Sequence, residues 1–311
     1  MLDPEKIYDV DPDVAAVLPT GDGVTGPVLL HALDGYVDAG NAAEQLVEHL
    51  RATFPAERLV TFDVDQLLNY RARRPLMVFD EDRWESYDDP ELAIDLLRDA
   101  EGTPFLLLYG REPDLQWERV VASLRAIVER FGVSLVVGTQ GVPMGVPHTR
   151  PVGATASATR SELIGVQPRV FGRVTVPAGF SHLLERRLGE AGVDAMGFSI
   201  HVPHYLAQGS FAPAALAAAS RIERTTGLDL RSGDLEPLSK EAIAEIDEQA
   251  TRSEEVQKVV AHLEAQYDSF VAAAGRTNLL AEAVPIPTAE EIGAELERFL
   301  AEQSAGDDGD A

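Results

Sequence analysis

The sequence contains no cysteine, and this absence excludes several kinds of chemistry at once. Without thiols the 311-residue chain can form no disulfide, and it has no cysteine nucleophile, cysteine-ligated zinc or iron–sulfur cluster. Any reaction chemistry must therefore use oxygen and imidazole groups. The chain also lacks a basic N-terminal region followed by an apolar run, and no stretch approaches about 18 uncharged apolar residues. We therefore expect a cytoplasmic protein without a membrane segment.

Basic residues are scarce, with 26 lysines and arginines against 52 aspartates and glutamates and a formal net charge of −26. Nucleic acids and anionic membrane surfaces carry charge of the same sign and should repel this protein. We therefore expect neither as a partner. Hydrophobic residues, by contrast, make up 45% of the chain, so it can bury a large core.

Short apolar runs alternate with helical patterns over roughly the first 200 residues. Strands are expected at Gly26 to Leu33, Arg58 to Val64, Pro75 to Phe79, Leu92 to Leu96, from Pro104, Val133 to Thr139, Gly172 to Gly179 and Asp194 to Val202. Helices are expected from Ala43 to Phe54, Pro113 to Phe131 and Ser181 to Gly192. The fourth and fifth strands form a hairpin that turns at Asp99 to Gly102, with a short helix from Pro90 to Arg98 as the alternative. This alternation predicts a layered α/β domain with a mixed or mostly parallel sheet.

The sequence becomes helical in character after His204. An alanine-rich helix is expected from Ala212, and apolar residues at spacings near multiples of 3.5 predict a helix from Ser239 to about Ala273. Thr288 with Glu291 makes a capping box that opens a final helix. We divide the chain into an N-terminal segment (1–23), an α/β/α core (24–209), a helical extension (210–303) and a disordered acidic tail (304–311).

The loop DGYVDAGN carries Asp34, Asp38 and Asn41 between a predicted strand and helix, where α/β sheets commonly bind ligands. Its glycines, Gly35 and Gly40, match no phosphate-binding motif. The two aspartates would also repel a bare phosphate unless a divalent cation neutralised them. The alternative is structural, with Asp38 or Asn41 capping the following helix.

The tripeptide VPH occurs twice, ending at His148 and at His204. With His201 the second copy forms an H-x-x-H pair, but strand residues three apart point to opposite faces, so we expect no metal site. The alternative is a histidine that hydrogen-bonds to a neighbouring loop where a strand ends. Other polar residues follow predicted strands in the same way. The resulting candidate pocket consists of Asp34, Asp38, Asn41, Tyr109, Arg111, His148, Arg150, His201 and His204. We assign no catalytic or cofactor-binding role to any of them.

Serine nucleophiles are not expected. Ser199 in GFSIH lies inside a predicted strand instead of at a strand-to-helix elbow, and helix capping explains Ser181. A basic cluster, Arg71, Arg73 and Arg74, is followed by Asp80, Glu81 and Asp82. These arginines could clamp an anion. The acid excess of the chain favours the alternative, in which they pair with those acids at a surface or a subunit contact.

Five stretches together, ALDGYVDAGNAAEQL, NYRARRPLMVFD, PFLLLYGREPDLQW, GVPMGVPHTRP and MGFSIHVPHYLAQ, resemble the bacterial branch of the proteasome assembly chaperone family, often labelled PAC-two. The resemblance implies a three-layer α/β/α sandwich with a mixed, mostly parallel sheet, similar to nucleoside phosphorylases and related hydrolases, plus a C-terminal helical extension. It also implies a homo-oligomer, in particular a trimer, and no established enzymatic activity. The eukaryotic relatives act by protein contact and escort proteasome α-subunits, in part through a C-terminal hydrophobic-Tyr-X tail. This chain ends in GDDGDA and lacks that tyrosine.

Two functions follow as hypotheses. The first is a non-catalytic, self-associating protein without a cofactor that acts as a chaperone or scaffold, with a proteasome subunit as its partner by analogy. The second is a hydrolase or phosphorylase-like enzyme, or a small-ligand binder, that uses a pocket at the strand-exit loops.

Overall fold

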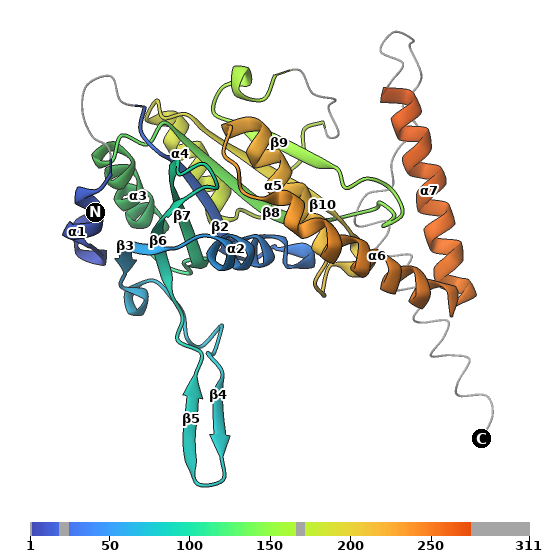
Figure 1. Ribbon diagram of the computed structural model, residues 1–311, viewed down its shortest axis with the longest axis horizontal. Helices are drawn as coiled ribbons and strands as arrows, with labels where there is room; N and C mark the ends of the chain where they lie inside the picture. The colour runs from blue at the N-terminus through green and yellow to red at the C-terminus, as the bar shows by residue number, and fades with distance from the viewer. Residues whose placement is uncertain (1, 19–24, 166–171, 275–311) are drawn as a thin grey trace. The chain divides into compact units, whose positions relative to one another are not determined.

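A computed structural model describes residues 2–18, 25–165 and 172–274. Its centre is an eight-stranded sheet with strand order β1-β3-β6-β7-β2-β8-β10-β9 (Figure 1). The strands, in chain order, are β1 Tyr8–Val10, β2 Val28–Asp34, β3 Glu57–Phe62, β6 Leu92–Arg98, β7 Pro104–Arg111, β8 Leu135–Met144, β9 Ala154–Ala158 and β10 Ala195–Pro203. The four central strands β7, β2, β8 and β10 run parallel, whereas the outer strands pair antiparallel.

Helices cover both faces of the sheet and complete the three layers that were predicted. The α-helices are α1 Pro12–Ala16, α2 Ala42–Thr53, α3 Trp117–Arg130, α4 Phe180–Glu190, α5 Ala212–Thr226, α6 Glu236–Thr251 and α7 Glu254–Ala274. Short 3-10 turns lie at Pro4–Ile7, Ala39–Asn41, Val64–Gln66, Ser161–Leu163, His204–Leu206 and Ser232–Leu235. None of the described helices combines the length and the apolar character that crossing a membrane requires.

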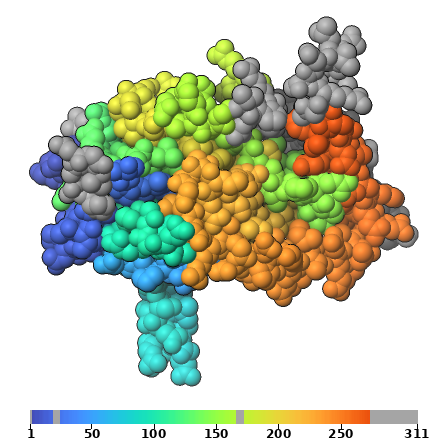
Figure 2. Space-filling view, turned by 45° about the horizontal axis from the view of Figure 1, so that its top comes forward, coloured from blue at the N-terminus to red at the C-terminus, as the bar shows by residue number. Residues whose placement is uncertain are grey.

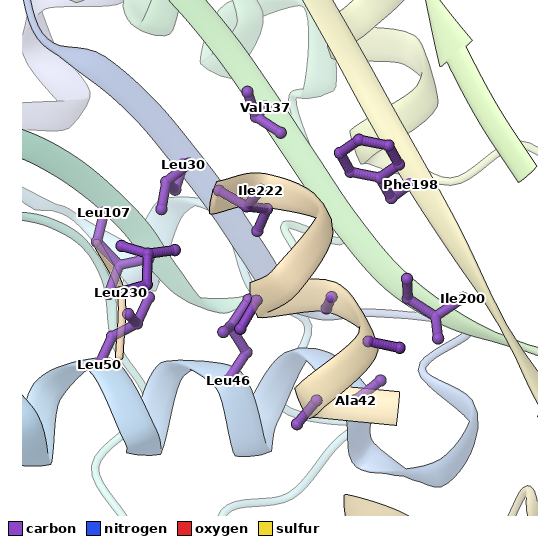
Figure 3. Packing of buried hydrophobic residues seen from close by; sticks show 14 of the residues in the cluster. Leu30, Ala42, Leu46, Leu50, Leu107, Val137, Phe198, Ile200, Ile222 and Leu230 are labelled. Carbon is purple, nitrogen blue, oxygen red and sulfur yellow. The ribbon is translucent and has the colours of Figure 1, made fainter. Parts of the chain in front are cut away.

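One face of the sheet is covered by α2 and α5. Leu46 and Leu50 of α2 and Ile222 of α5 point toward Leu30 and Val137 of the sheet (Figure 3). Alanines on the buried side of α5 let it pack closely against α2, and all of these side chains are fully or almost fully buried. The hydrophobic core on this face therefore continues through the alanine-rich helix that follows residue 210.

The opposite face is covered by α3 and α4. Leu124 and Ile127 of α3 and Leu184 of α4 belong to a second buried cluster, which includes Leu29 of β2. The predicted amphipathic pattern of α3 is confirmed, because its buried residues recur at helical spacing from Val120 to Val128.

A two-stranded hairpin, β4 Met77–Asp80 with β5 Arg83–Tyr87, stands apart from the main sheet. It extends away from the neighbouring elements in Figures 1 and 2. Every residue from 76 to 89 is exposed. The strand predicted at Pro75 to Phe79 therefore exists but does not join the central sheet, and its partner β5 was not predicted.

Two further predictions are wrong. No strand forms at 172–179, and the strand next to β10 is instead β9, the alternating small and polar segment ATASA. The helix predicted from Ser239 to Ala273 is divided between Thr251 and Glu254, where Ser253 accepts hydrogen bonds from the N–H groups of Val256 and Gln257 and begins α7.

The hairpin predicted at Asp99 to Gly102 is confirmed. Asp99 Oδ1 accepts hydrogen bonds from the N–H groups of Glu101 and Thr103, and Gly102 has φ +86° in the turn between β6 and β7. The predicted capping box at Thr288 and Glu291 and the acidic tail lie outside the described residues. The domain boundaries stay predictions.

Candidate functional site

Asp34 and Arg111 end two neighbouring parallel strands, β2 and β7, and lie opposite each other in the register. Their side chains form an ion pair, and Arg111 Nη2 also lies 3.3 Å from Asp88 Oδ2. Arg73 reaches the same edge, where its Nη1 donates to the Asp34 carbonyl and its Nη2 forms an ion pair of 2.9 Å with Asp114. Among the described residues, Arg73 pairs with Asp114 and not with the acids at 80–82, and pairing of the basic cluster with those acids at a subunit contact stays a prediction.

Asp38 caps α2, which was one of the alternatives that the sequence left open. Its carboxylate accepts hydrogen bonds from the N–H groups of Ala43 at 2.9 Å and Gly141 at 2.8 Å, and so joins α2 to β8. Burial raises the pKa of Asp38, opposed by these backbone hydrogen bonds. Asn41 adopts the left-handed conformation at φ 51° and makes no capping bond with its side chain.

Tyr109 lies away from these loop residues, in the core on the α2 side of the sheet. Its hydroxyl accepts a hydrogen bond of 2.6 Å from Arg58 Nη2, and the Arg51 guanidinium lies 4.3 Å from the ring centre. Burial raises the pKa of Tyr109 well above its usual range.

The first VPH loop holds the C-terminal helices. His148 is buried. Its Nδ1 is 2.6 Å from the Tyr205 hydroxyl, and its Nε2 is 3.0 Å from Oδ1 of Asp247 on α6. Arg150 binds Asp268 at 2.8 Å and Glu264 at 3.0 Å, both on α7. Two residues of one loop, His148 and Arg150, therefore anchor two helices.

The second VPH places His204 beside the same tyrosine. The His148 and His204 rings pack edge-on against the Tyr205 ring, with centroids 5.8 Å and 5.4 Å away. His201 is buried elsewhere, with its Nε2 2.9 Å from Thr155 Oγ1, and burial lowers its pKa to about 4. Within the part of the chain that the structure describes, no three His, Asp or Glu side chains are arranged to hold a metal ion.

The structure thus joins Asp34 with Arg111, and His148 with His204 around Tyr205. The Asn41 N–H group donates to the Asp38 carbonyl, whereas Tyr109, Arg150 and His201 bind separate partners. The role of all nine residues as one ligand pocket stays a prediction.

A polar row crosses the sheet face beneath α4, where sequence reasoning expected no site. His31 of β2 lies opposite Gly138 of β8, Gly138 lies opposite Gly197 of β10, and Gly197 lies opposite Ser157 of β9. These residues line a hollow of about 270 Å³, which includes space open to solvent. His182 and Glu185 of α4 line it from above.

The two glycines make room for the polar side chains. A Cβ at Gly138 would lie 2.3 Å from Cε1 of His31, and one at Gly197 would lie 3.0 Å from Oε2 of Glu185. Burial lowers the pKa of His31 to about 4, with a smaller contribution from His182. Burial also raises the pKa of Glu185, whose Oε2 accepts a hydrogen bond of 2.7 Å from Ser157.

A second hollow of about 350 Å³, again including open space, adjoins the first and shares with it Gln140, Ser181 and His182. Glu112 lies in its wall and accepts hydrogen bonds from the N–H groups of Tyr36, at 2.7 Å, and of Phe180 at the start of α4. The structure therefore offers two adjoining hollows at the N-terminal half of α4, each with polar groups in its wall.

The sequence did contain a signal for this site. In β8 and β10, strands that should be apolar on both faces, Gly138 alternates with Gln140 and Gly197 with Ser199. Glycine inside a strand marks a bulge or a close approach of another group. Both serines dismissed as nucleophiles, Ser181 and Ser199, line the first hollow.

The hairpin β4–β5 is a separate candidate surface. Met77 pairs with Tyr87 and Phe79 with Trp84, so four large side chains share one face. The Phe79 and Trp84 ring centroids are 5.1 Å apart, yet these residues remain 56% and 63% exposed. An exposed apolar face of this kind is typical of a protein–protein contact.

Comparison with solved structures finds proteins similar to this chain over most of its length. A Mycobacterium tuberculosis protein of unknown function is 43% identical, with a TM-score of 0.81, and the match covers 86% of this chain and 92% of that one. A Corynebacterium glutamicum protein of unknown function is 34% identical, with a TM-score of 0.79, covering 86% and 99%. A proteasome-assembly chaperone homologue of M. tuberculosis is 26% identical, with a TM-score of 0.67, covering 75% and 99%.

A comparison with curated proteins finds no match. The model of the PAC2 family matches residues 32–250, which include the strand-exit loops, the hairpin, the strands β7, β8 and β10, and Gly138, Ser157 and Gly197 of the polar row. This chain therefore belongs to the PAC2 family.

Proposed function

We propose that this protein acts through protein contacts as a self-associating chaperone or scaffold, and that the hairpin β4–β5 binds a second copy of the chain. Membership of the PAC2 family and the similarity to a proteasome-assembly chaperone homologue support a chaperone-like role. The observation that carries the proposal is the exposed apolar face of the hairpin.

An isolated two-stranded hairpin is marginally stable in water unless its apolar face packs against something. In this chain the described residues around Phe79 and Trp84 leave that face uncovered. A partner surface would bury it and would also order the hairpin. The apolar face therefore favours a lasting contact over a free loop.

The charges at the two ends of the hairpin support a second copy of the chain as its binding partner. At the base of the hairpin, Arg71 and Arg74 are exposed and form no ion pair with any described residue. Asp80, Glu81 and Asp82 at its tip are likewise exposed and unpaired among the described residues. Base and tip are about 20 Å apart by the rise of an extended strand, so they cannot meet within one chain. In two copies placed tip to base, they can.

The tip and the base are different patches, so copies can join tip to base in a head-to-tail arrangement, and such a heterologous contact can close as a ring. A ring of three is the assembly that the family resemblance implies. The client of such an assembly, by analogy with the proteasome-assembly chaperone homologue, is a proteasome subunit.

Analytical ultracentrifugation of the purified full chain tests this proposal. We expect wild type to sediment as a discrete oligomer and the double substitution Phe79→Ser with Trp84→Ser to sediment as a monomer. Leu238→Ser is the matched control, because it removes an equally exposed apolar side chain, 54% exposed, from α6. A monomeric wild type, or dissociation by Leu238→Ser alone, would contradict the proposal.

A charge exchange tests the tip-to-base arrangement. We expect Arg74→Glu to weaken association by about tenfold or more, because it places like charges together. Adding Asp82→Arg in the same chain should restore association. If the combined variant is weaker than either single variant, the copies do not pair tip to base.

A further inference from the structure

We propose that the hollow beneath α4, floored by Gly138 and Gly197, is a binding site for a small ligand that donates N–H hydrogen bonds, of the ammonium or primary-amine class. Nothing in the similarity to other proteins assigns such a site. It is independent of the hairpin, and it does not use the strand-exit aspartates or histidines.

The sheet face is built around this hollow. Residues of three parallel strands and one antiparallel strand stand in one row, His31, Gly138, Gly197 and Ser157. An inner sheet face normally carries apolar side chains that pack against the covering helix. Here the two central positions of the row lack side chains, and polar groups stand on both sides of them.

The imidazole of His31 is the observation that points to a ligand. Its residue is 97% buried, since only 3% of its surface is exposed, and Nδ1 has no hydrogen-bond partner among the described residues. Leaving a buried polar atom unpaired costs about 1–3 kcal/mol. A Cβ at Gly138 would lie 2.4 Å from Nε2 of this ring and 3.2 Å from Nδ1, so the nitrogens lie beside the hollow. A neutral imidazole presents one acceptor and one donor nitrogen, so an N–H donor in the hollow can bind the ring.

The charges around the hollow select the class of ligand. The residues that line it include Glu185, Ser157, Ser181 and Ser199. Glu112 stands in the wall of the adjoining hollow. No lysine or arginine lines either hollow in the described part of the chain. Phosphate and carboxylate would meet carboxylates without a compensating cation, whereas an ammonium group finds acceptors.

The size of the hollow limits the ligand to a few heavy atoms. Its space of about 270 Å³ includes the part open to solvent, and the His31 ring and the Glu185 carboxyl group lie directly over the two glycines. Methylammonium, with two heavy atoms, is therefore a suitable probe. The adjoining hollow along Gln140 and His182 leaves room for a short substituent.

Nuclear magnetic resonance of the full chain tests the site with methylammonium chloride as the probe. The Cε1–H signals of His31 and His182, assigned by His31→Asn and His182→Asn, should shift and saturate at millimolar concentration. Sodium chloride at equal ionic strength should leave them in place. No saturable shift would overturn the proposal, and a saturable shift with inorganic phosphate instead would show that the site takes anions.

Two variants locate the binding. Glu185→Gln keeps the shape of the side chain but removes its charge, and should weaken methylammonium binding by about tenfold or more. Glu190→Gln makes the same change on the same helix, at a side chain that pairs with Arg186 and Arg187 outside the hollow, and should bind like wild type. Equal affinity in all three proteins would overturn the assignment. Should Glu185→Gln fail to fold, Gly197→Ala offers a second test, because its methyl group enters the hollow.

Discussion

The strands β8 and β10 present two different faces to the two helix layers. Toward α2 and α5 they present Val137, Phe198 and Ile200, which belong to a continuous apolar core. Toward α4 the same strands present Gly138 and Gly197 in a row of polar groups. Because successive side chains of a strand point to opposite faces of the sheet, one strand can be apolar on one face and polar on the other. The apolar face accounts for stability, and the polar face gives up packing to keep polar groups inside the protein, among them the unpaired Nδ1 of His31.

Truncation on the apolar face should have the largest effect on folding. Ile222→Ala on α5 removes a fully buried side chain from the cluster and should lower the free energy of unfolding by about 3 kcal/mol. Urea denaturation followed by circular dichroism measures this. Leu238→Ala on the exposed side of α6 should change it by less than about 0.5 kcal/mol. Equal effects of the two substitutions would show that α5 does not share the core.

A methyl group on the polar face should have a smaller but specific effect. Gly138→Ala places a Cβ 2.3 Å from Cε1 of His31, so the ring must move, at a cost of about 1–3 kcal/mol in unfolding free energy. In combination with His31→Ala the cost should be less than the sum of the two single costs, because the ring is gone. Gly209→Ala, where a Cβ meets open space, is the control. Additive costs would mean that His31 does not require the glycine.

Buried histidines should also make the unfolding free energy depend on pH. Near neutral pH this effect should be smaller than the effects of the two substitutions above. Burial lowers the pKa of His31 and of His201 to about 4 in the folded protein, below the 6.5 of an unfolded histidine. Below pH 6.5 the unfolded chain therefore binds protons that the folded chain does not bind. Each histidine should lower the unfolding free energy by up to about 1.4 kcal/mol per pH unit between pH 6.5 and 4.

Denaturation at several pH values, with each variant compared with wild type, isolates these contributions. His31→Asn and His201→Asn should each flatten the dependence on pH over that interval. His262→Asn, at an exposed position of α7, should leave it unchanged. If the unfolding free energy of His31→Asn and of His201→Asn depends on pH as in wild type, other groups cause the pH dependence.

Periodicity predicted the parts of the fold in which burial follows a regular pattern. The α3 helix and the hairpin between β6 and β7 were recognised because their apolar residues recur at one spacing and Asp99 and Gly102 mark the turn. β9 was missed because ATASA has small side chains and lies at the edge of the sheet, next to β10 alone. The hairpin arm was misplaced because PLMVF has the apolar composition of a buried strand although its residues are exposed.

The candidate site depended on register, which the sequence does not show. His31, Gly138 and Gly197 come from strands far apart in the chain, and only the pairing of β2 with β8 and β8 with β10 aligns them. The strand-exit residues were easier to select because each follows an apolar run. Most of them turned out to bind structural partners: Asp38 accepts hydrogen bonds from α2 and β8, and Arg150 pairs with α7.

The position of β2 has a consequence for the order in which the chain is synthesised. Val28 pairs with Phe105 of β7 on one side and with Leu135 of β8 on the other, so this early strand lies between two that emerge from the ribosome much later. At a translation rate of about 5–20 residues per second, several seconds pass between the synthesis of the apolar segment VLLHAL and that of both strands that pair with it. During that interval the nascent chain exposes a strand with two open edges. Translation speed between residues 34 and 135 should therefore influence how much of this protein reaches its native state.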